Sequence, residues 1–226
     1  MNILAIFMKH PEPGKVKTRL GQEIGFEEAA ELYRAFQLDF LDSTHQISDQ
    51  RVIAFSPVTP ESRKFFTEHA DENDLLWEQP DATLGERLIQ VFDEFLNEAN
   101  RVVVIGSDSP SLPNGLIEQA FRQLETSDVV LGPACDGGYY LVGQRIHCSE
   151  MFSNISWSEP VVLSQTVERI RNTPRSLSLL NPWYDVDSLD DLQTLSGHLT
   201  AMEASNTIEN FPTRTAELTR KLLAEL

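Results

Sequence analysis

Short apolar runs alternate with longer amphipathic segments along this chain, and this alternation limits the possible fold more than any other feature of the sequence. The run Arg101–Gly106 is continuously apolar after its first residue, which is typical of a strand buried on both faces. The segment before it, 84–99, carries apolar residues at helical spacing. The pattern therefore predicts an α/β fold with a mostly parallel central sheet flanked by helices.

The same pattern gives the order of the elements. The expected strands are 3–8, 51–56, 101–106, 129–131, 139–142 and 176–180, and the expected helices are 26–41, 60–69, 84–99, 113–124, 160–171, 189–199 and 213–226. A length of 226 residues suits a single domain, 1–226, without a linker or repeat. The final helix, 213–226, is interpreted as an amphipathic tail that could serve as a homodimer contact.

Charge and composition exclude some classes of protein. The net charge of -17 repels a nucleic-acid backbone, so we expect no nucleic-acid partner. No apolar run reaches the roughly 18 residues of a membrane span, and the N-terminus lacks the features of a signal peptide. The two cysteines have no metal-ligand spacing, and we expect a cytoplasmic protein.

A basic loop follows the first expected strand. Lys9, Lys15, Lys17 and Arg19 fall within eleven positions of an otherwise acidic chain, and Gly14 permits a tight turn there. Ligands of open parallel sheets bind beyond the carboxyl ends of the strands. The loop is therefore predicted to bind phosphates, although it matches neither a Walker P-loop nor a dinucleotide fingerprint. The alternative is an ordinary solvated basic loop.

Two aspartates follow other expected strands. Asp108 stands two residues after the run Arg101–Gly106, and an aspartate in that position is costly to desolvate without a partner. We expect Asp108 to be catalytic and to bind Mg²⁺ or Mn²⁺, with Asp187 as the second metal ligand. The alternative for Asp108 is to cap the following helix, and Asp190 beyond Asp187 also suits a helix N-terminus.

A glycine-rich motif and an arginine complete the candidate residues. Asp136-Gly137-Gly138-Tyr139 is typical of a hairpin turn, but its glycines would also let backbone amides approach a ligand. On the second interpretation Asp136 is catalytic and Gly137, Gly138 and Tyr139 bind the substrate. Arg87 stands near the start of an expected helix, where it could contact a phosphate or a base; the alternative is an ordinary turn.

In this order the motifs resemble a known family. The segments that carry the resemblance are Lys9 with 13–20, 84–87, 106–110, 132–139 and 185–192, within residues 1–195. They resemble the radical-SAM/selenodomain-associated transferases, and residues 17–20 with 136–138 are also similar to 2-phospholactate guanylyltransferases. The resemblance implies a GT-A-like, Rossmann-like domain. Glycosyltransferases of this fold carry Asp-x-Asp at the metal position, whereas this chain has Asp108-Ser-Pro, so a second ligand must come from elsewhere.

The expected function is a metal-dependent transferase. It would use a nucleoside triphosphate or a nucleotide sugar and pass a nucleotidyl or glycosyl group to a small-molecule acceptor. One alternative is a non-catalytic, regulatory nucleotide-binding protein of the same fold. Another is a phosphatase of the haloacid-dehalogenase type, because Asp185-Val-Asp187-Ser resembles its nucleophile motif; that motif, however, normally follows the first strand.

Overall fold

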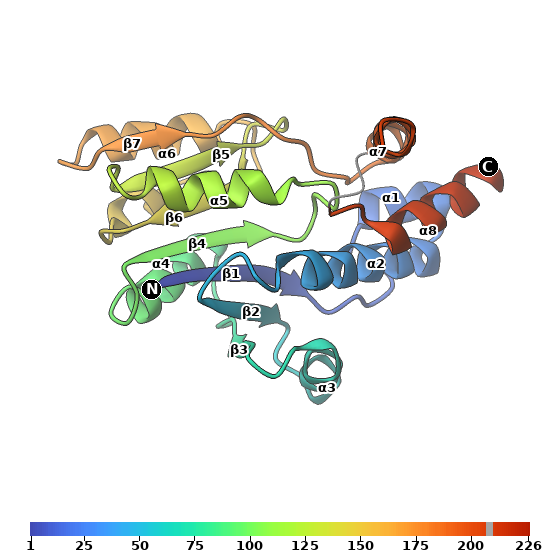
Figure 1. Ribbon diagram of the computed structural model, residues 1–226, viewed down its shortest axis with the longest axis horizontal. Coiled ribbons are helices and arrows are strands. Elements are labelled where there is room, and N and C mark those ends of the chain that lie inside the picture. Colours follow the sequence, from blue (N-terminus) through green and yellow to red (C-terminus); the bar gives the residue numbers. More distant parts are fainter. Residues whose placement is uncertain (207–209) are drawn as a thin grey trace.

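One seven-stranded sheet organises the computed structural model, which describes residues 1–206 and 210–226 (Figure 1). Its strand order is β3-β2-β1-β4-β6-β5-β7. The strands are β1 (Asn2–Lys9), β2 (Gln50–Ser56), β3 (Leu75–Glu78), β4 (Arg101–Gly106), β5 (Val129–Pro133), β6 (Tyr139–Gln144) and β7 (Leu177–Leu179). The predicted α/β fold with a mostly parallel, helix-flanked sheet is confirmed.

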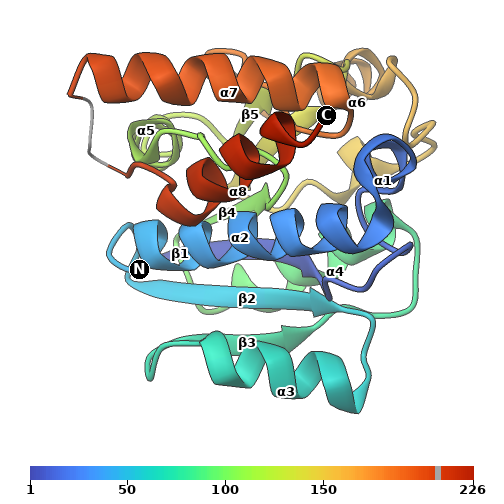
Figure 2. The same cartoon turned by 90° about the vertical axis from the view of Figure 1, so that its right-hand side faces the viewer.

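The helices lie on both faces of the sheet and beyond one of its ends (Figures 1 and 2). They are α1 (Thr18–Ile24), α2 (Phe26–Thr44), α3 (Pro60–His69), α4 (Leu84–Phe95), α5 (Asn114–Gln123), the 3₁₀ helix η1 (Ser149–Phe152), α6 (Val162–Arg171), α7 (Leu189–Ala204) and α8 (Thr213–Ala224). None of the described helices has the length and apolar character that crossing a membrane requires.

The direction of the strands brings several chain segments to one edge of the sheet. β1 pairs in parallel with β2 and with β4, where Ala5 is opposite Val52 and Val104. These three strands therefore end at the same edge. Only β6 among the described strands runs against its neighbours, with Val142 opposite Val104, so its first residue, Tyr139, lies at that same edge.

Alternating side chains of β1 divide the core into two layers. Leu4 packs with apolar residues of α2, α3 and α5 on one face, and Ala5 packs with residues of α4, η1 and α6 on the other. A third apolar cluster joins α1, α2, α7 and α8. In Figure 1, α1, α7 and α8 lie beyond the sheet on the side where β1 and β4 end.

Three elements were not predicted. β3 has only four residues, of which only Trp77 is buried, so it shows too little alternation to be recognised. The seven-residue helix α1 begins inside the basic loop at Thr18, although the loop was expected to be irregular. It forms because Val16 and Leu20 are buried in the third cluster, a tertiary contact that local sequence does not reveal. The 3₁₀ helix η1 was also not predicted.

Candidate functional site

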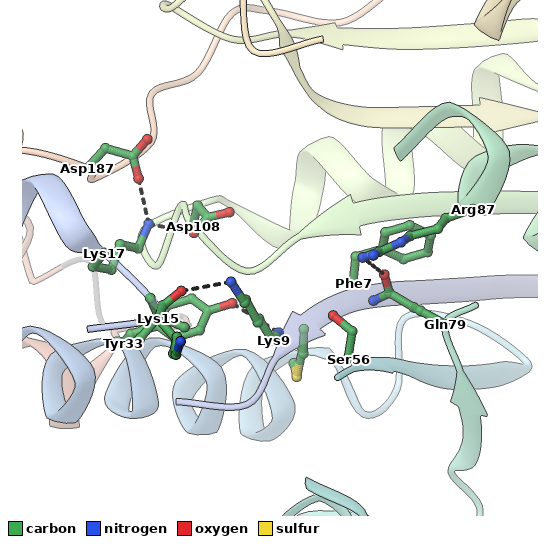
Figure 3. Close-up of a pocket in the computed structure, with 12 residues that line it drawn as sticks. Phe7, Lys9, Lys15, Lys17, Tyr33, Ser56, Gln79, Arg87, Asp108 and Asp187 are labelled. Atoms are coloured by element: carbon green, nitrogen blue, oxygen red, sulfur yellow. Dashed lines mark hydrogen bonds and ion pairs between the residues drawn. The ribbon is translucent and has the colours of Figure 1, made fainter. Parts of the chain in front are cut away.

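A cavity of about 320 Å³ lies at the edge where β1, β2 and β4 end (Figure 3). It is lined by Phe7, Met8, Lys9, Lys15, Val16, Lys17, Tyr33, Ser56, Gln79, Arg87, Asp108 and Asp187. The structure thus brings together basic and acidic side chains that the sequence analysis selected from four separate segments. Their roles in binding and catalysis remain predictions.

Lys17 is the central charge of this cavity. Its Nζ lies 2.5 Å from Oδ1 of Asp108 and 2.9 Å from Oδ1 of Asp187, and its side chain is only 3% exposed. Burial disfavours the charged ammonium, but the two carboxylates outweigh burial and raise the pKa of Lys17. The cavity therefore contains a permanent positive charge held between two negative ones.

The backbone at Lys17 is unusual as well. With φ 43° and ψ 44°, this residue occupies the left-handed region immediately before α1, a conformation uncommon for residues other than glycine. Its ammonium also lies 5.5 Å from the ring centre of Tyr33 and 5.8 Å from that of Phe36. Cation–π contacts and two ion pairs together offset a backbone cost on the order of 1–3 kcal/mol.

A backbone hydrogen bond sets Asp187 beside Asp108. The N–H of Val186 donates to the carbonyl oxygen of Asp108 over 3.0 Å, and the Val186 side chain is fully buried. Burial would raise the pKa of Asp187, but Lys17 and Arg19 lower it. Arg19 contributes through a 2.7 Å contact with Oδ2, while its own side chain is 72% exposed.

Capping does not explain Asp108. The helix that follows, α5, has Pro113 at its N-cap and no side-chain cap, so the capping alternative for Asp108 is wrong. At α7 the capping interpretation holds for another residue: Asp191 and Ser188 form a capping box there. Asp187 precedes that box and directs its carboxylate to Lys17 and Arg19 instead.

Asp185 is an acidic residue to which the sequence analysis gave no separate role. Its Oδ1 is buried and has no hydrogen-bond partner among the described residues. Burial and the neighbouring carboxylates of Asp136, Asp187 and Asp108 raise the pKa of Asp185 to about 7, against the opposing effect of Lys17. Negative charge is therefore concentrated on this side of the cavity.

The acidic residues fit a divalent cation that is shared with a ligand. No set of three or more His, Cys, Asp or Glu side chains within 1–206 and 210–226 forms a ready metal site. Asp108 and Asp187 nevertheless offer two hard carboxylates, with the unpartnered oxygen of Asp185 nearby. Mg²⁺ commonly takes one or two carboxylates and completes its coordination with water and substrate phosphates.

The first cavity shares five lining residues with a larger hollow of about 730 Å³. Both are lined by Lys9, Lys15, Ser56, Gln79 and Arg87, and the larger one extends past the loops that follow β2 and β3. Figure 3 shows Arg87 and Gln79 facing one another. The Arg87 guanidinium donates to Oε1 of Gln79 over 3.3 Å and to the carbonyl oxygen of Ala82 over 2.8 Å.

Lys9 and Gly14 determine the conformation of the basic loop. The Lys9 ammonium donates to the carbonyl oxygen of Lys15 over 2.7 Å, which folds the loop back on itself (Figure 3). Gly14 has φ 73°, in the left-handed region, as a tight turn requires. Lys15 itself is exposed, so its ammonium can reach a ligand in either hollow.

The Asp136 motif is a turn between β5 and β6. Oδ1 of Asp136 accepts from the N–H of Gly138 over 2.8 Å, and Gly137 has φ 93°. A Cβ at Gly137 would lie 2.2 Å from the carbonyl oxygen of Pro160, so the turn packs closely against that segment. Asp136 is exposed and does not line the cavity, while Tyr139 lines a separate hollow beside Asp108.

Tyr33, Ser56 and Gln79 line the cavity but had no assigned role. The Tyr33 hydroxyl contacts Oγ of Ser107 over 2.8 Å and accepts from the N–H of Lys9 over 3.3 Å. Tyr33 belongs to the middle of α2, where it has the spacing of a core residue. Nothing in the local sequence distinguishes it, whereas Ser56 at a strand end could have been selected by the rule that selected Asp108.

Comparisons with known proteins agree with this architecture. The family model described as "Uncharacterized protein conserved in bacteria (DUF2064)" matches residues 42–159. A proposed nucleotide-diphospho-sugar transferase from Desulfovibrio desulfuricans G20 is 33% identical and has a TM-score of 0.87; the match covers 98% of this chain and 97% of that one. No curated protein matches the chain.

Two more distant structures share the fold alone. The 4-diphosphocytidyl-2C-methyl-D-erythritol synthase from Anaerococcus prevotii DSM 20548 is 12% identical with a TM-score of 0.59, covering 88% of this chain and 96% of that one. CMP:2-keto-3-deoxy-manno-octonic acid synthetase, in complex with CTP, is 13% identical with a TM-score of 0.53, covering 89% and 99%. The fold is thus that of nucleotidyl- and sugar-transferases.

Proposed function

This chain belongs to the DUF2064 family, and from that premise we propose that it is a nucleotidyltransferase that acts on a small hydroxyl-bearing acceptor. The observation that carries the proposal is the placement of Lys17 between Asp108 and Asp187 in a cavity also lined by Lys9, Lys15 and Arg87. Such an arrangement provides cations for a phosphate chain and carboxylates for its counter-ion.

The basic residues account for phosphate binding by an acidic protein. A net charge of -17 opposes anions at long range, so a phosphorylated ligand needs a local cluster of cations. Lys9, Lys15 and Arg87 line both adjoining hollows. We assign the nucleoside to the larger hollow and the triphosphate to the smaller one, where Lys17 adds further positive charge and the exposed Arg19 lies beside Asp187.

We assign Mg²⁺ or Mn²⁺ to Asp108 and Asp187. When bound, the ion would offset charge on the phosphate oxygens and the leaving group. Lys17 contacts Oδ1 of both carboxylates, so an ion held by these oxygens would compete with its ammonium for them. Lys17 is predicted to contact the phosphates.

The transfer step requires mainly alignment. An acceptor hydroxyl oxygen forms a bond to the α-phosphorus, the bond from that phosphorus to the bridging oxygen breaks, and pyrophosphate leaves with the electron pair while the hydroxyl proton passes to water. Lys15, Lys17 and Arg87 would hold the phosphates in line, as is usual in phosphoryl chemistry. The catalytic role of Asp136 and substrate contacts from Gly137 and Gly138 stay predictions, since none of the three residues lines the cavity.

Glycosyl transfer from a nucleotide sugar is the second candidate. It is favoured by one specific observation, the assigned activity of the Desulfovibrio desulfuricans relative at 33% identity. The same phosphate and cation positions would serve it, but the acceptor would attack an anomeric carbon and release a nucleoside diphosphate. Release of pyrophosphate, by contrast, identifies nucleotidyl transfer.

Calorimetric titration tests the proposal directly. GTP, CTP, UTP and a UDP-sugar are titrated into the full chain with Mg²⁺ or Mn²⁺, and at least one is expected to bind. Lys15→Ala should weaken that binding about tenfold, since it removes a charge-assisted contact of roughly 1.5 kcal/mol. Lys64→Ala, on the exposed surface of α3, is the matched control. Failure of every nucleotide to bind would overturn the proposal.

Turnover separates an enzyme from a regulatory protein of the same fold. Nucleotide binding without product across an acceptor panel would favour the regulatory alternative. A phosphatase of the haloacid-dehalogenase type has less support, because Asp187 is already paired with Lys17 and Arg19 and the basic loop, not the Asp-x-Asp motif, follows β1. A homodimer contact through α8 remains a prediction.

A further inference from the structure

A third hollow, of about 230 Å³, lies beside Asp108 on the α4 side of the sheet. Its lining comes from β1, β4, β6 and α4, and consists of Phe7, Leu84, Leu88, Val104, Ile105, Gly106, Asp108, Tyr139, Tyr140, Leu141 and Val142. It shares Phe7 and Asp108 with the cavity assigned to the triphosphate. A ligand here would therefore adjoin the phosphates.

The chemistry of this hollow differs sharply from that of its neighbour. Among the described residues that line it, Asp108 is the only charged one and none is basic. Leu84, at the first turn of α4, keeps 44% of its surface exposed, which is a high fraction for a large apolar side chain next to a polar site. An anion placed here would meet a carboxylate and no compensating cation.

We infer that this hollow is the acceptor subsite and that it takes an uncharged molecule with an apolar or aromatic body, whose hydroxyl points to Asp108. The inference rests on the proposed function, because the hollow adjoins the phosphate cavity. Apolar walls with a few polar groups at one end are typical of small-molecule sites. The volume restricts the acceptor to a small body of about one ring.

The inference disagrees with one sequence resemblance. Similarity to 2-phospholactate guanylyltransferases implies a phosphorylated acid as acceptor. Such a ligand carries several negative charges, and this hollow has no Lys or Arg among its described lining residues to bind them. The cations that could bind a phosphorylated acid, Lys9, Lys15 and Arg87, line the other two hollows instead.

Gly106 provides a direct way to fill the hollow. It follows Val104 by two positions in β4, so a side chain at 106 projects from the same face of the sheet as Val104. A Cβ at this position would meet only Oδ2 of Asp108, at 3.5 Å, which is an ordinary contact. Gly106→Val should therefore fold and occupy the hollow. Gly115→Val, where a Cβ meets nothing within 4 Å, is the matched control.

The test uses two probes that differ in charge, benzyl alcohol and phenyl phosphate. Each is titrated into the full chain with Mg²⁺ and a non-hydrolysable nucleoside triphosphate, and ligand NMR reports saturation transfer. Benzyl alcohol should bind, and its Kd should rise about tenfold in Gly106→Val and in Leu84→Asp but not in Gly115→Val. Phenyl phosphate should show no binding that depends on residue 106.

Three results would overturn the inference. These are no binding of benzyl alcohol, binding that neither variant weakens, and stronger, Gly106-dependent binding of phenyl phosphate. If Gly106→Val does not fold, Leu84→Asp still tests the inference, because Leu84 is exposed and its substitution is expected to leave the fold intact. Nucleotide titrations without acceptor separate the two proposals: nucleotides that fail to bind, while benzyl alcohol binds as described, would remove the proposed nucleotidyl transfer and leave the hollow as a binding site for an uncharged molecule.

Discussion

The ammonium of Lys17 lies 2.5 Å from the carboxylate of Asp108, although 91 positions of sequence separate the two residues. The contact joins the basic loop after β1 to the end of β4. Asp187, from a third segment, contacts the same ammonium. One buried charge therefore holds three segments of the chain together. The first two predictions concern that charge.

Lys17→Met should lower the free energy of unfolding by about 2 kcal/mol, less than for a fully buried pair because both carboxylates keep contact with solvent. The substitution leaves Asp108 and Asp187 to repel one another without their shared cation. Urea unfolding followed by circular dichroism measures the change. Lys15→Met, on the exposed part of the same loop, should be nearly neutral; equal losses in both variants would contradict the explanation.

The same variant should bind Mn²⁺ more tightly than the wild type when no nucleotide is present. The Lys17 ammonium occupies the carboxylate oxygens that a cation would use, and its positive charge repels the ion. Removing it should raise Mn²⁺ affinity about tenfold, measured by electron paramagnetic resonance of the free ion. Unchanged or weaker binding would show that Asp108 and Asp187 are not the ligands.

Asp185 should make stability depend on pH. Its pKa is raised from 3.8 to about 7 in the folded protein, mainly by burial and then by Asp136, Asp187 and Asp108, with Lys17 opposing. The folded state therefore holds this proton more tightly than the unfolded chain does. The stabilisation is complete below the unfolded pKa and is lost as the pH rises through about 7.

Asp185→Asn removes that titration. Compared with the wild type, the variant should lose less stability between about pH 5 and about pH 8, since an amide stays neutral throughout. Urea midpoints at both pH values measure the difference. Asp190→Asn, on the exposed first turn of α7, controls for the general loss of a negative charge. A pH dependence identical to that of the wild type would refute the assignment.

Arg87→Met should weaken nucleotide binding about tenfold while leaving the fold intact. The guanidinium is oriented by Gln79 and by the carbonyl oxygen of Ala82, and it lines both hollows assigned to the nucleotide. Arg122→Met is a suitable control, because Arg122 is 62% exposed and pairs with Glu118 on α5, and neither residue lines either hollow. Titration calorimetry compares the two; equal affinities would remove Arg87 from the site.

Asp39→Ala should loosen the C-terminal helix. The Asp39 carboxylate accepts from the N–H of Thr215 over 2.8 Å and contacts Arg214, and α8 has no side-chain cap of its own. Loss of these buried bonds should cost about 2 kcal/mol and speed hydrogen exchange of the α8 amides. Asp42→Ala, which removes only an exposed partner of Arg214, should have a smaller effect. Exchange rates that do not differ between the two would contradict this role.

Much of the fold could be predicted from hydrophobic periodicity alone. The run Arg101–Gly106 is a buried strand because the five residues after Arg101 leave no polar face. The predicted tail helix 213–226 corresponds to α8, which buries only one of its faces. β3 was not predicted because only Trp77 of its four residues is buried. Short edge strands carry too few buried positions to produce a period.

The candidate site was predictable in part for a geometric reason. Parallel strands end at one edge of a sheet, so Lys9 at the end of β1 and Asp108 after β4 had to lie near one another once both strands were recognised. Tyr33 enters the same cavity from the middle of a helix, and no rule about strand ends could select it. Asp136 also follows a strand, but its turn directs it outside that cavity.

By itself, the sequence determined which segments form strands and which charged residues stand at their ends, because burial and periodicity are local properties of the chain. Only the tertiary structure decided that the ammonium of Lys17 is shared by Asp108 and Asp187, and that the hollow beside Asp108 is apolar. Both depend on the distance between residues far apart in the chain. Coulombic attraction depends on the distance between charges, and burial depends on which residues surround a side chain. Both are therefore set only when the chain has folded.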